Sequence, residues 1–130
     1  MDQRPPVILI AEDEFNLREM YVTALTLAGF EVLPAKNGEE ALDWLEKRYS
    51  EINLILLDVV MPVMDGFETL ENIKKDARFK EIAVLISTNL DNNEDRQQSI
   101  EMGARGYYIK SLLTPAELIA EINAILAEKK

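Results

Sequence analysis

Short apolar runs alternate along the chain with longer stretches in which apolar residues recur at helical spacing. An uninterrupted apolar run is typical of a strand buried on both faces, whereas the helical spacing is typical of a helix with one buried face. The runs predict strands at residues 7–11, 31–35, 52–57, 82–86 and 107–109. The spaced stretches predict helices at residues 15–28, 38–49 and 67–76, in a short segment ending near residue 103, and from residue 115 onward. The polar segment 89–95 is predicted to be a loop.

Two of the predicted helices carry specific start signals. Asn37 precedes the second helix as an N-cap, and Glu40 follows three positions later in a variant of the capping box. Thr114, Pro115 and Glu117 supply a capping residue, a first-position proline and a third-position acid for the last helix. These residues predict where both helices begin.

The alternation of strands and helices favours an α/β fold in a single domain over residues 1–130. Crossovers of this kind are right-handed and produce a mainly parallel sheet with helices on both faces. Pro34 lies inside the second predicted strand. Because proline cannot donate to a central hydrogen-bond ladder, that strand is expected at an edge of the sheet.

Charged and hydroxyl side chains follow four of the five predicted strands. Glu12 and Asp13 follow the first strand, Asp58 the third, Ser87 the fourth and Lys110 the fifth. The carboxyl ends of parallel strands meet at one edge, where ligands of such sheets bind. Three carboxylates close together require either raised pKa values or a cation between them, and Mg²⁺ suits such an oxygen-rich site. A carboxylate can attack phosphorus to form an acyl phosphate, so the set is consistent with phosphoryl transfer to Asp58.

Each of these residues has a plainer explanation when it is taken alone. Acidic residues favour helix N-termini, so Glu12, Asp13 and Glu14 could form only a solvated helix start. A lone lysine such as Lys110 is more often a surface residue, and hydroxyl residues often simply end strands. Tyr107 is most simply a packed strand residue. The functional interpretation therefore depends on the residues occurring together at one sheet edge.

Composition narrows the chemistry that the chain can perform. At 130 residues the chain is large enough for one domain with its own core, and it contains no cysteine and no histidine. These absences exclude a thiol nucleophile, a Ser-His-Asp triad and a phosphohistidine carried by this chain. Any metal must be held by oxygen ligands, which favours magnesium, calcium or manganese.

The net charge of the chain limits the classes of partner that it can bind. The formal net charge is −10 and the isoelectric point is near 4.5. Such a chain is a poor match for nucleic acid or for an anionic membrane surface, both of which attract basic residues. Neither a membrane-spanning stretch nor the apolar segment of a signal peptide is apparent. We therefore expect a soluble cytoplasmic protein that binds neither nucleic acid nor membrane directly.

Four motifs in a fixed order resemble a known family. They are the acidic pair Glu12-Asp13, LLDVVMPVMDG around Asp58, Ser87 after the fourth strand, and GARGYYIK ending at Lys110. Over essentially its whole length, the chain resembles the receiver domain of two-component response regulators, the family that includes the chemotaxis response regulator. The resemblance implies a flavodoxin-like (βα)5 fold with strand order 2-1-3-4-5. It also implies a phosphorylation-activated signalling domain that catalyses only its own phosphorylation and dephosphorylation.

The resemblance assigns a role to each motif residue. Asp58 would accept a phosphoryl group from a phosphohistidine on a sensor histidine kinase or a histidine phosphotransfer protein. Asp13 and the backbone carbonyl of Val60 would share Mg²⁺, or alternatively Mn²⁺, with Asp58. Glu12 would act mainly through a metal-bound water, and Lys110 would pair with the phosphoryl group.

The resemblance also implies a switch. Ser87 would swing toward the phosphoryl group, and Tyr107 would then turn inward. This movement would alter the face formed by the fourth helix, the fifth strand and the fifth helix. That face would bind a downstream protein or form a weak dimer of an otherwise monomeric protein. Val60 and Asn89, two positions beyond Asp58 and Ser87, would tune the lifetime of the phosphoryl group.

Two positions depart from the family pattern. Ser111 follows Lys110 where the family usually has a proline after a cis bond, which leaves the path of this loop open. Thr88 stands where alanine or glycine is usual, so its branched side chain is expected to narrow access to the phosphorylation site.

Two other functions compete with the phosphorylation switch. A receiver-like scaffold would bind its partners with or without a phosphoryl group, an alternative motivated by Ser111 and Thr88. A phosphohydrolase with an aspartyl nucleophile would need a second Asp two positions after Asp58, but Val60 stands there. The chain ends directly after its last predicted helix, as expected of a stand-alone receiver or of one part of a longer protein.

Overall fold

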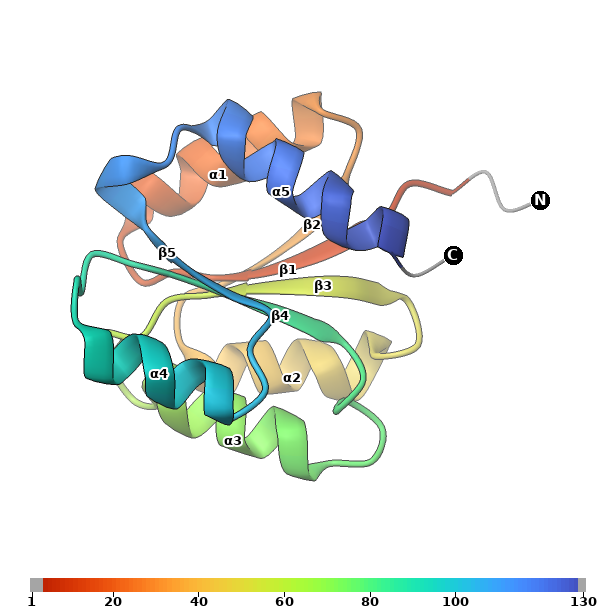
Figure 1. The fold of residues 1–130 in the computed structure, drawn as a ribbon. Helices are drawn as coiled ribbons and strands as arrows, with labels where there is room; N and C mark the ends of the chain where they lie inside the picture. The colour runs from red at the N-terminus through yellow and green to blue at the C-terminus, as the bar shows by residue number, and fades with distance from the viewer. Residues whose placement is uncertain (1–3, 129–130) are drawn as a thin grey trace.

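The computed structural model describes residues 4–128 and shows a central sheet of five parallel strands between two layers of helices (Figure 1). The strands are β1 (Val7–Ala11), β2 (Glu31–Ala35), β3 (Ile52–Leu57), β4 (Ala83–Thr88) and β5 (Gly106–Ile109). Their order is β2-β1-β3-β4-β5, which confirms the predicted fold class. β2, which contains Pro34, forms an edge of the sheet as its proline predicts.

The helices cover both faces of the sheet. They are α1 (Phe15–Leu27), α2 (Gly38–Arg48), α3 (Gly66–Lys75), α4 (Asn93–Glu101) and α5 (Pro115–Glu128), with a 3₁₀ turn (Lys110–Leu112) before α5. α1 and α5 pack on one face, and α2, α3 and α4 pack on the other (Figure 1). The two layers therefore enclose two separate apolar cores.

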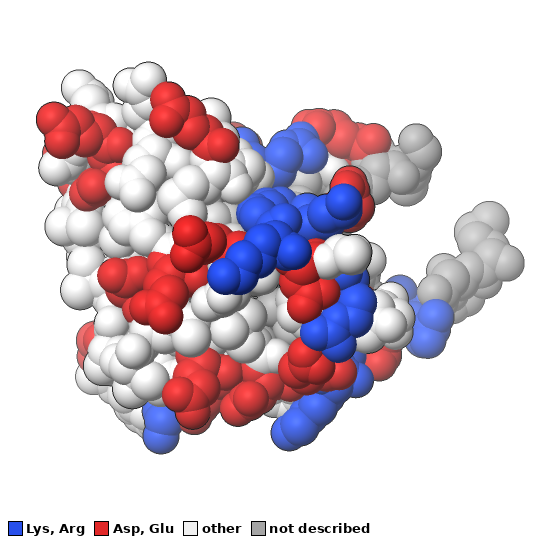
Figure 2. Space-filling view, turned by 90° about the horizontal axis from the view of Figure 1, so that it is seen from below, with Lys and Arg blue, Asp and Glu red and all other residues white. Residues whose placement is uncertain are grey.

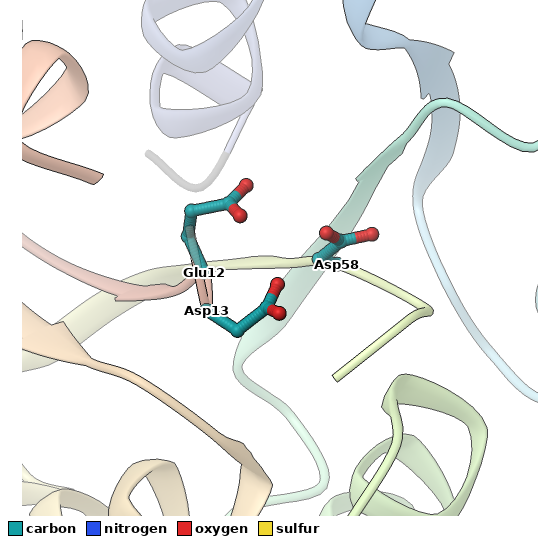
Figure 3. Close-up of side chains that lie close together, drawn as sticks. All are labelled: Glu12, Asp13 and Asp58. Carbon is teal, nitrogen blue, oxygen red and sulfur yellow. The ribbon is translucent and has the colours of Figure 1, made fainter. Parts of the chain in front are cut away.

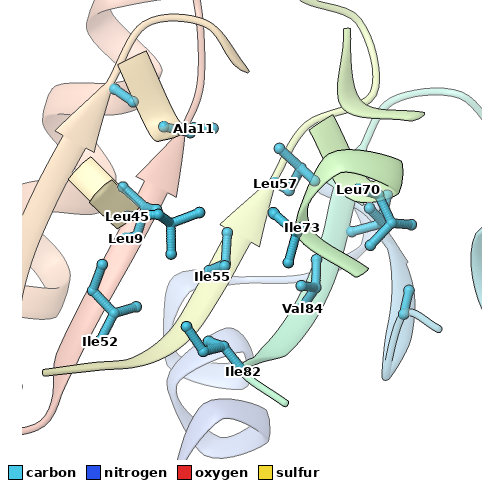
Figure 4. Close-up of a cluster of buried hydrophobic side chains, with 14 of the residues drawn as sticks. Leu9, Ala11, Leu45, Ile52, Ile55, Leu57, Leu70, Ile73, Ile82 and Val84 are labelled. Carbon is cyan, nitrogen blue, oxygen red and sulfur yellow. The ribbon is translucent and has the colours of Figure 1, made fainter. Parts of the chain in front are cut away.

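Alternation along the strands divides the apolar side chains between these cores. In β3, Ile55 and Leu57 point into the core beneath α2 and α3 (Figure 4), whereas Leu54 and Leu56 point toward α1 and α5. The next residue with the orientation of Leu54 and Leu56 is Asp58. The same two-residue period that builds the cores therefore directs this carboxylate to the α1 and α5 side of the sheet.

Both predicted helix starts are confirmed. The amide of Glu117 donates to Thr114 Oγ1 at 3.1 Å, and the amide of Thr114 donates to the Glu117 carboxylate at 2.9 Å, which completes a capping box. Asn37 Oδ1 accepts from the Glu40 amide at 2.8 Å, while the Glu40 carboxylate accepts from the amide of Lys36. The Glu40 carboxylate thus reaches one residue beyond the position that a capping box requires.

The largest boundary error concerns α4. It begins at Asn93, inside the segment 89–95 that was predicted to be a loop, and the side chain of Asn92 caps it by accepting two backbone amides. The helix has one buried residue, Ser99, so no apolar period marked its first turn. β4 also extends through Ser87 and Thr88, because both residues pair with β5. The boundaries of the other elements agree with the prediction to within one residue.

The surface carries acidic and basic side chains together. On the side where α2, α3 and α4 lie, the two kinds are interspersed (Figure 2). Arg78, for example, bonds to the carboxylates of both Glu46 and Asp76. The net charge of −10 therefore does not produce a uniformly acidic face here. Within residues 4–128, no helix has the length and apolar character needed to cross a membrane.

Candidate functional site

The candidate site lies at the carboxyl edge of the sheet, on the side covered by α1 and α5. Glu12 directly follows β1, Asp58 directly follows β3, Lys110 directly follows β5, and Ser87 is the penultimate residue of β4. Glu12, Asp58 and Ser87 line one small recess there. Residues far apart in the sequence therefore meet because parallel strands end together, as the strand pattern predicts.

Three carboxylates form the centre of the site. Oxygen atoms of Glu12, Asp13 and Asp58 all lie within 4.8 Å of one another (Figure 3). Glu12 and Asp58 are only 2% and 6% exposed, whereas Asp13 is open to solvent. Burial raises the pKa of the Glu12 carboxyl, although hydrogen bonds from Lys110 and the Glu14 amide oppose the rise. The cluster thus concentrates negative charge and has one side accessible from outside.

Lys110 supplies the positive charge at this site. Its Nζ lies 2.7 Å from Asp58 Oδ2 and also pairs with the Glu12 carboxylate. Burial would lower the pKa of Lys110, but its bonds to Asp58 and Glu12 outweigh that effect and raise it. The lysine is therefore a cation at neutral pH, held between two carboxylates.

The loop after Lys110 keeps this contact without the family's usual proline. All peptide bonds among the described residues are trans, and Lys110 to Leu112 form a 3₁₀ turn that leads toward α5. Ser111 is exposed in this turn. The path that the sequence left open therefore still brings the ammonium group to Asp58.

Backbone interactions hold the acidic loop after β1. Glu14, whose side chain accepts the Leu17 amide, is the N-cap of α1, so the alternative of a helix start applies to this residue. The Glu14 amide donates to the Glu12 carboxylate at 3.0 Å. The Arg18 guanidinium donates to the carbonyls of Glu12 and Asp13 at 2.8 and 3.2 Å. These contacts position the two acids before any ligand binds.

The glycine of the LLDVVMPVMDG motif has a packing role beside Asp58. A Cβ atom on Gly66 would lie 2.2 Å from the Asp58 carbonyl oxygen and 2.7 Å from the Val59 Cα. The Gly66 amide also donates to the Val59 carbonyl at 2.8 Å. Only glycine allows the start of α3 to approach the end of β3 this closely, and this approach holds the backbone that carries Asp58.

Of the remaining predicted site residues, some line the recess beside Asp58 and others lie outside it. Ser87 is buried in the recess with Asp58. Successive side chains of a strand point to opposite faces of the sheet, so the buried Thr88 lies on the other side. There its Oγ1 accepts a hydrogen bond from the Leu90 amide at 3.3 Å. Val60 and Asn89 have exposed side chains, and the Val60 amide donates to Asp58 Oδ1 at 3.3 Å. The roles assigned to Thr88, Val60 and Asn89 remain predictions.

Tyr107 is buried on the α4 side of the sheet and already points inward. Its hydroxyl donates to the Leu90 carbonyl at 2.6 Å. Arg96 of α4 donates to the Tyr107 carbonyl at 3.0 Å and lies over its ring, 5.0 Å from the centroid. Tyr107 thus links β5 to the β4–α4 loop and to α4. Its movement during switching remains a prediction.

Sequence reasoning missed one residue of the recess. Tyr21 belongs to the apolar spacing that predicts a helix at residues 15–28, and the structure shows that it also lines the recess together with Asp58 and Ser87. The signal available was a phenolic hydroxyl in a stripe otherwise formed by aliphatic side chains such as Leu17 and Leu25. Without the strand order, nothing in the sequence indicated which residue this hydroxyl would meet.

The donor set fits a hard divalent cation. The three carboxylates and the single ammonium group carry a formal charge of −2 when all are ionised, and a divalent ion would neutralise it. All available ligands are oxygen atoms, the type that Mg²⁺ and Mn²⁺ prefer. Asp13 provides the exposed side from which an ion and its waters can enter.

Comparisons with known proteins agree with this geometry. The sequence model of the response regulator receiver domain matches residues 8–123. The chain is 36% identical over 126 residues to a probable transcriptional regulator, ycf27, of Porphyra purpurea, covering 97% of this chain and 49% of that protein. It spans about half the length of the curated relatives that it matches.

Solved structures show the same fold. The chemotaxis protein CheY4 of Vibrio cholerae has a TM-score of 0.85 and 30% identity, with 92% of this chain and 98% of that chain covered. CheY in the CheX-CheY-BeF3-Mg²⁺ complex of Borrelia burgdorferi has a TM-score of 0.87 and 26% identity, with 94% and 90% covered. This chain therefore belongs to the response regulator receiver domain family, the phosphorylation-activated signalling domains of two-component systems.

Proposed function

We propose that Asp58 is the phosphoacceptor of this receiver domain and that its phosphorylation controls the binding of a partner protein. The observation that carries the proposal is the position of Lys110 Nζ, 2.7 Å from Asp58 Oδ2 within a cluster of three carboxylates. A buried lysine beside a carboxylate offers a cation for the oxygen atoms of an incoming phosphoryl group. We take residues 1–130 as a single receiver domain.

The reaction needs only a nucleophile and charge stabilisation from this chain. A carboxylate oxygen of Asp58 attacks the phosphorus of a phosphohistidine, a P–O bond forms, and the P–N bond breaks to release the donor imidazole. Lys110 contacts a phosphoryl oxygen, and Ser87 donates its hydroxyl proton to another. Glu12, Asp13, Asp58 and the Val60 carbonyl are the groups that would hold Mg²⁺. When bound, this ion supplies charge neutralisation for the phosphoryl oxygens.

The proposed partners follow from this chemistry. Because these 130 residues contain no histidine, the phosphohistidine must lie outside them, on a sensor histidine kinase or a histidine phosphotransfer protein. The output partner would bind the face formed by α4, β5 and α5, which Tyr107 links to the β4–α4 loop. A weak dimer through the same face is the alternative use of this surface. Longer relatives such as PhoB of Pseudomonas aeruginosa are transcriptional regulators, so a DNA-binding domain is a second candidate partner.

Acetyl phosphate with Mg²⁺ provides a direct test without a partner kinase. Intact-mass spectrometry should detect one added phosphoryl group that hydroxylamine removes, as expected of an acyl phosphate. Asp58→Asn and chelation of the metal should each abolish the addition. The exposed Asp43→Asn on α2 is the matched control and should be phosphorylated normally. Unchanged phosphorylation of Asp58→Asn would show that the acceptor is another residue.

The same experiment separates the competing functions. Continuous release of phosphate from an ester substrate would support a phosphohydrolase, although Val60 occupies the position where such enzymes need an acid/base. Equal partner affinity with and without the phosphoryl group would support the scaffold instead. The receiver proposal expects a single acyl phosphate per chain and an affinity that depends on it.

A further inference from the structure

The outer edge of β2 has no partner strand among the described residues, because β2 lies at one end of the sheet. Along a strand, successive residues direct their backbone amide and carbonyl groups to opposite sides. The Glu31 amide and the Ala35 carbonyl both bond to residues that flank β1, at 2.9 and 3.0 Å. The backbone groups of Val32 and Pro34, which alternate with these positions, therefore point outward from the sheet.

Outward backbone groups of an edge strand can pair with a strand of another molecule. Pro34 offers no such groups. Its nitrogen carries no hydrogen, and its carbonyl oxygen accepts a hydrogen bond from Trp44 Nε1 of α2 at 2.8 Å. The donor at this position is thus removed by the type of residue, and the acceptor is occupied by the tryptophan.

The neighbouring outward positions are also engaged. The amide of Lys36, directly after β2, donates to the Glu40 carboxylate at 2.9 Å, the contact by which Glu40 departs from a capping box. The amide of Phe30, directly before β2, donates to the Leu25 carbonyl at 3.1 Å. Between residues 30 and 36, only Val32 then remains for an incoming strand. Because a ladder needs bonds at successive alternate residues, this one residue cannot hold a strand.

We propose that Trp44 and Glu40 act with Pro34 to close the β2 edge, so that a second copy of the chain cannot add a strand to the sheet there. Both side chains belong to α2, and the Trp44 ring packs against the core beneath this helix, which fixes the position of its Nε1 group. This inference does not depend on the assignment of Asp58. Its consequence is that copies of this chain associate, where they do so, through a surface other than β2.

The hydrogen bond between Trp44 and Pro34 can be tested in the unaltered protein. The chain contains one tryptophan, so its NMR spectrum has a single indole N–H signal. The indole proton should exchange with water more slowly than that of a short tryptophan peptide, because exchange requires the bond to open. Exchange at the rate of the peptide would show that the Pro34 carbonyl is free, and the inference would be overturned.

The second test opens the edge. Pro34→Val restores the missing amide, and Trp44→Phe frees the carbonyl while it keeps an aromatic ring on α2. In a symmetric antiparallel pair, position 32 of one copy faces position 34 of the other, and the two bonds of each facing pair need both a donor and an acceptor at position 34. The double variant should therefore self-associate at least about tenfold more tightly than either single variant. Sedimentation velocity over a range of concentrations measures this, without Mg²⁺ or a phosphoryl donor, so that phosphorylation does not contribute.

Pro5→Val combined with Trp44→Phe is the matched control. It makes the same change of composition, but Pro5 is exposed and lies before β1. This control should sediment like the wild-type protein. In dimers of the edge variant, the backbone amides of positions 32 and 34 should exchange with deuterium more slowly than in its monomer, which locates the contact at β2.

Two results would contradict the closed edge. A folded edge variant that associates no more tightly than the control would overturn the inference, and so would association that leaves the amides of positions 32 and 34 unprotected. Urea unfolding verifies that each variant is folded. Pro34→Ala in place of Pro34→Val restores the same amide with a smaller side chain and serves as the edge variant if the first combination does not fold.

Discussion

Val63 has a backbone conformation that β-branched residues rarely adopt. Its φ is +69°, and it is the only residue other than glycine with positive φ within residues 4–128. The left-handed region costs an ordinary residue about 1–2 kcal/mol, because Cβ approaches the following carbonyl oxygen. The side chain is 74% exposed, so packing does not compensate for this cost. Val63 is therefore a strained position in the loop that connects Asp58 to α3.

Replacing Val63 with asparagine should stabilise the protein. Asparagine tolerates the left-handed region and avoids the extra unfolded-state entropy of glycine, so Val63→Asn should raise the free energy of unfolding by about 1 kcal/mol. Urea denaturation provides the measurement. Val60→Asn is the control, since Val60 is exposed in the same loop without a positive φ. Equal effects of the two substitutions would mean that side-chain polarity, rather than backbone strain, causes the change.

At the scale of residues, sequence reasoning located the charges of the site but not the contribution of Tyr21 to its recess. Asp58 and Lys110 could be placed because each directly follows a strand, and strand ends converge for purely geometric reasons. The position of Tyr21 in the same recess as Ser87 depends on how α1 packs across the sheet, which no local pattern encodes. The positive φ of Val63 could not be predicted either, because valine is not a residue type that favours the left-handed conformation.

The elements were easiest to predict where a cap or an apolar period marks them. Thr114 and Glu117 predicted the start of α5, and the structure shows their reciprocal hydrogen bonds. α4 was misplaced because Asn93–Glu101 is almost entirely polar and has a single buried residue. Its N-cap, Asn92, stands among several Asn and Asp residues, any of which could have capped a helix.

The capping box of α5 makes the stability of this helix depend on pH. Hydrogen bonds from the backbone and side chain of Thr114 lower the pKa of Glu117 below its ordinary value of 4.5. A lowered pKa favours the folded state above the ordinary value, and this contribution is lost as the pH falls through the lowered pKa. Glu117→Ala should therefore be less stable than wild type at pH 7, and the difference should shrink as the solution is acidified below about pH 4.5.

Urea unfolding at a series of pH values measures this difference. Glu19→Ala is the matched control, because Glu19 is an exposed glutamate on a helix, away from the capping box of α5. Its difference from wild type should be small and should not follow the same pH profile. A difference for Glu117→Ala that stays constant through the acidic range would show that the carboxylate charge does not contribute to the cap.

At the scale of the whole molecule, the site lies on the α1 and α5 side of the sheet, whereas Tyr107 and α4, which belong to the proposed output face, lie on the other side (Figure 1). Asp58 and Ser87 face α1 and α5, whereas Tyr107 faces α4. The physical connection between them is short. Ser87 and Tyr107 lie on adjacent strands, and Leu90 of the β4–α4 loop bonds to both Tyr107 and Thr88. A displacement of Ser87 therefore acts directly on the loop that leads into α4.

The weak anchoring of α4 determines where such a displacement should be observed. α3 buries four residues, including Leu70 and Ile73, whereas α4 buries only Ser99. Elements with few buried contacts open at low free-energy cost, so amides of α4 should exchange with deuterium faster than those of α3. Hydrogen exchange followed by mass spectrometry can resolve the two helices. Protection of α4 equal to that of α3 would contradict this order.

Binding of beryllofluoride, a phosphoryl mimic, with Mg²⁺ should then change exchange in a confined region. The β4–α4 loop and α4 should respond, because Tyr107 and Arg96 connect them to β5, and β2 and α2 should not. Tyr107→Phe removes the bond to the Leu90 carbonyl but keeps the ring, so it should reduce the response of α4 while the mimic still binds at Asp58. If the response of α4 were unchanged in this variant, the signal would travel by another route, and the contact between Tyr107 and Leu90 would be a packing feature of the resting structure.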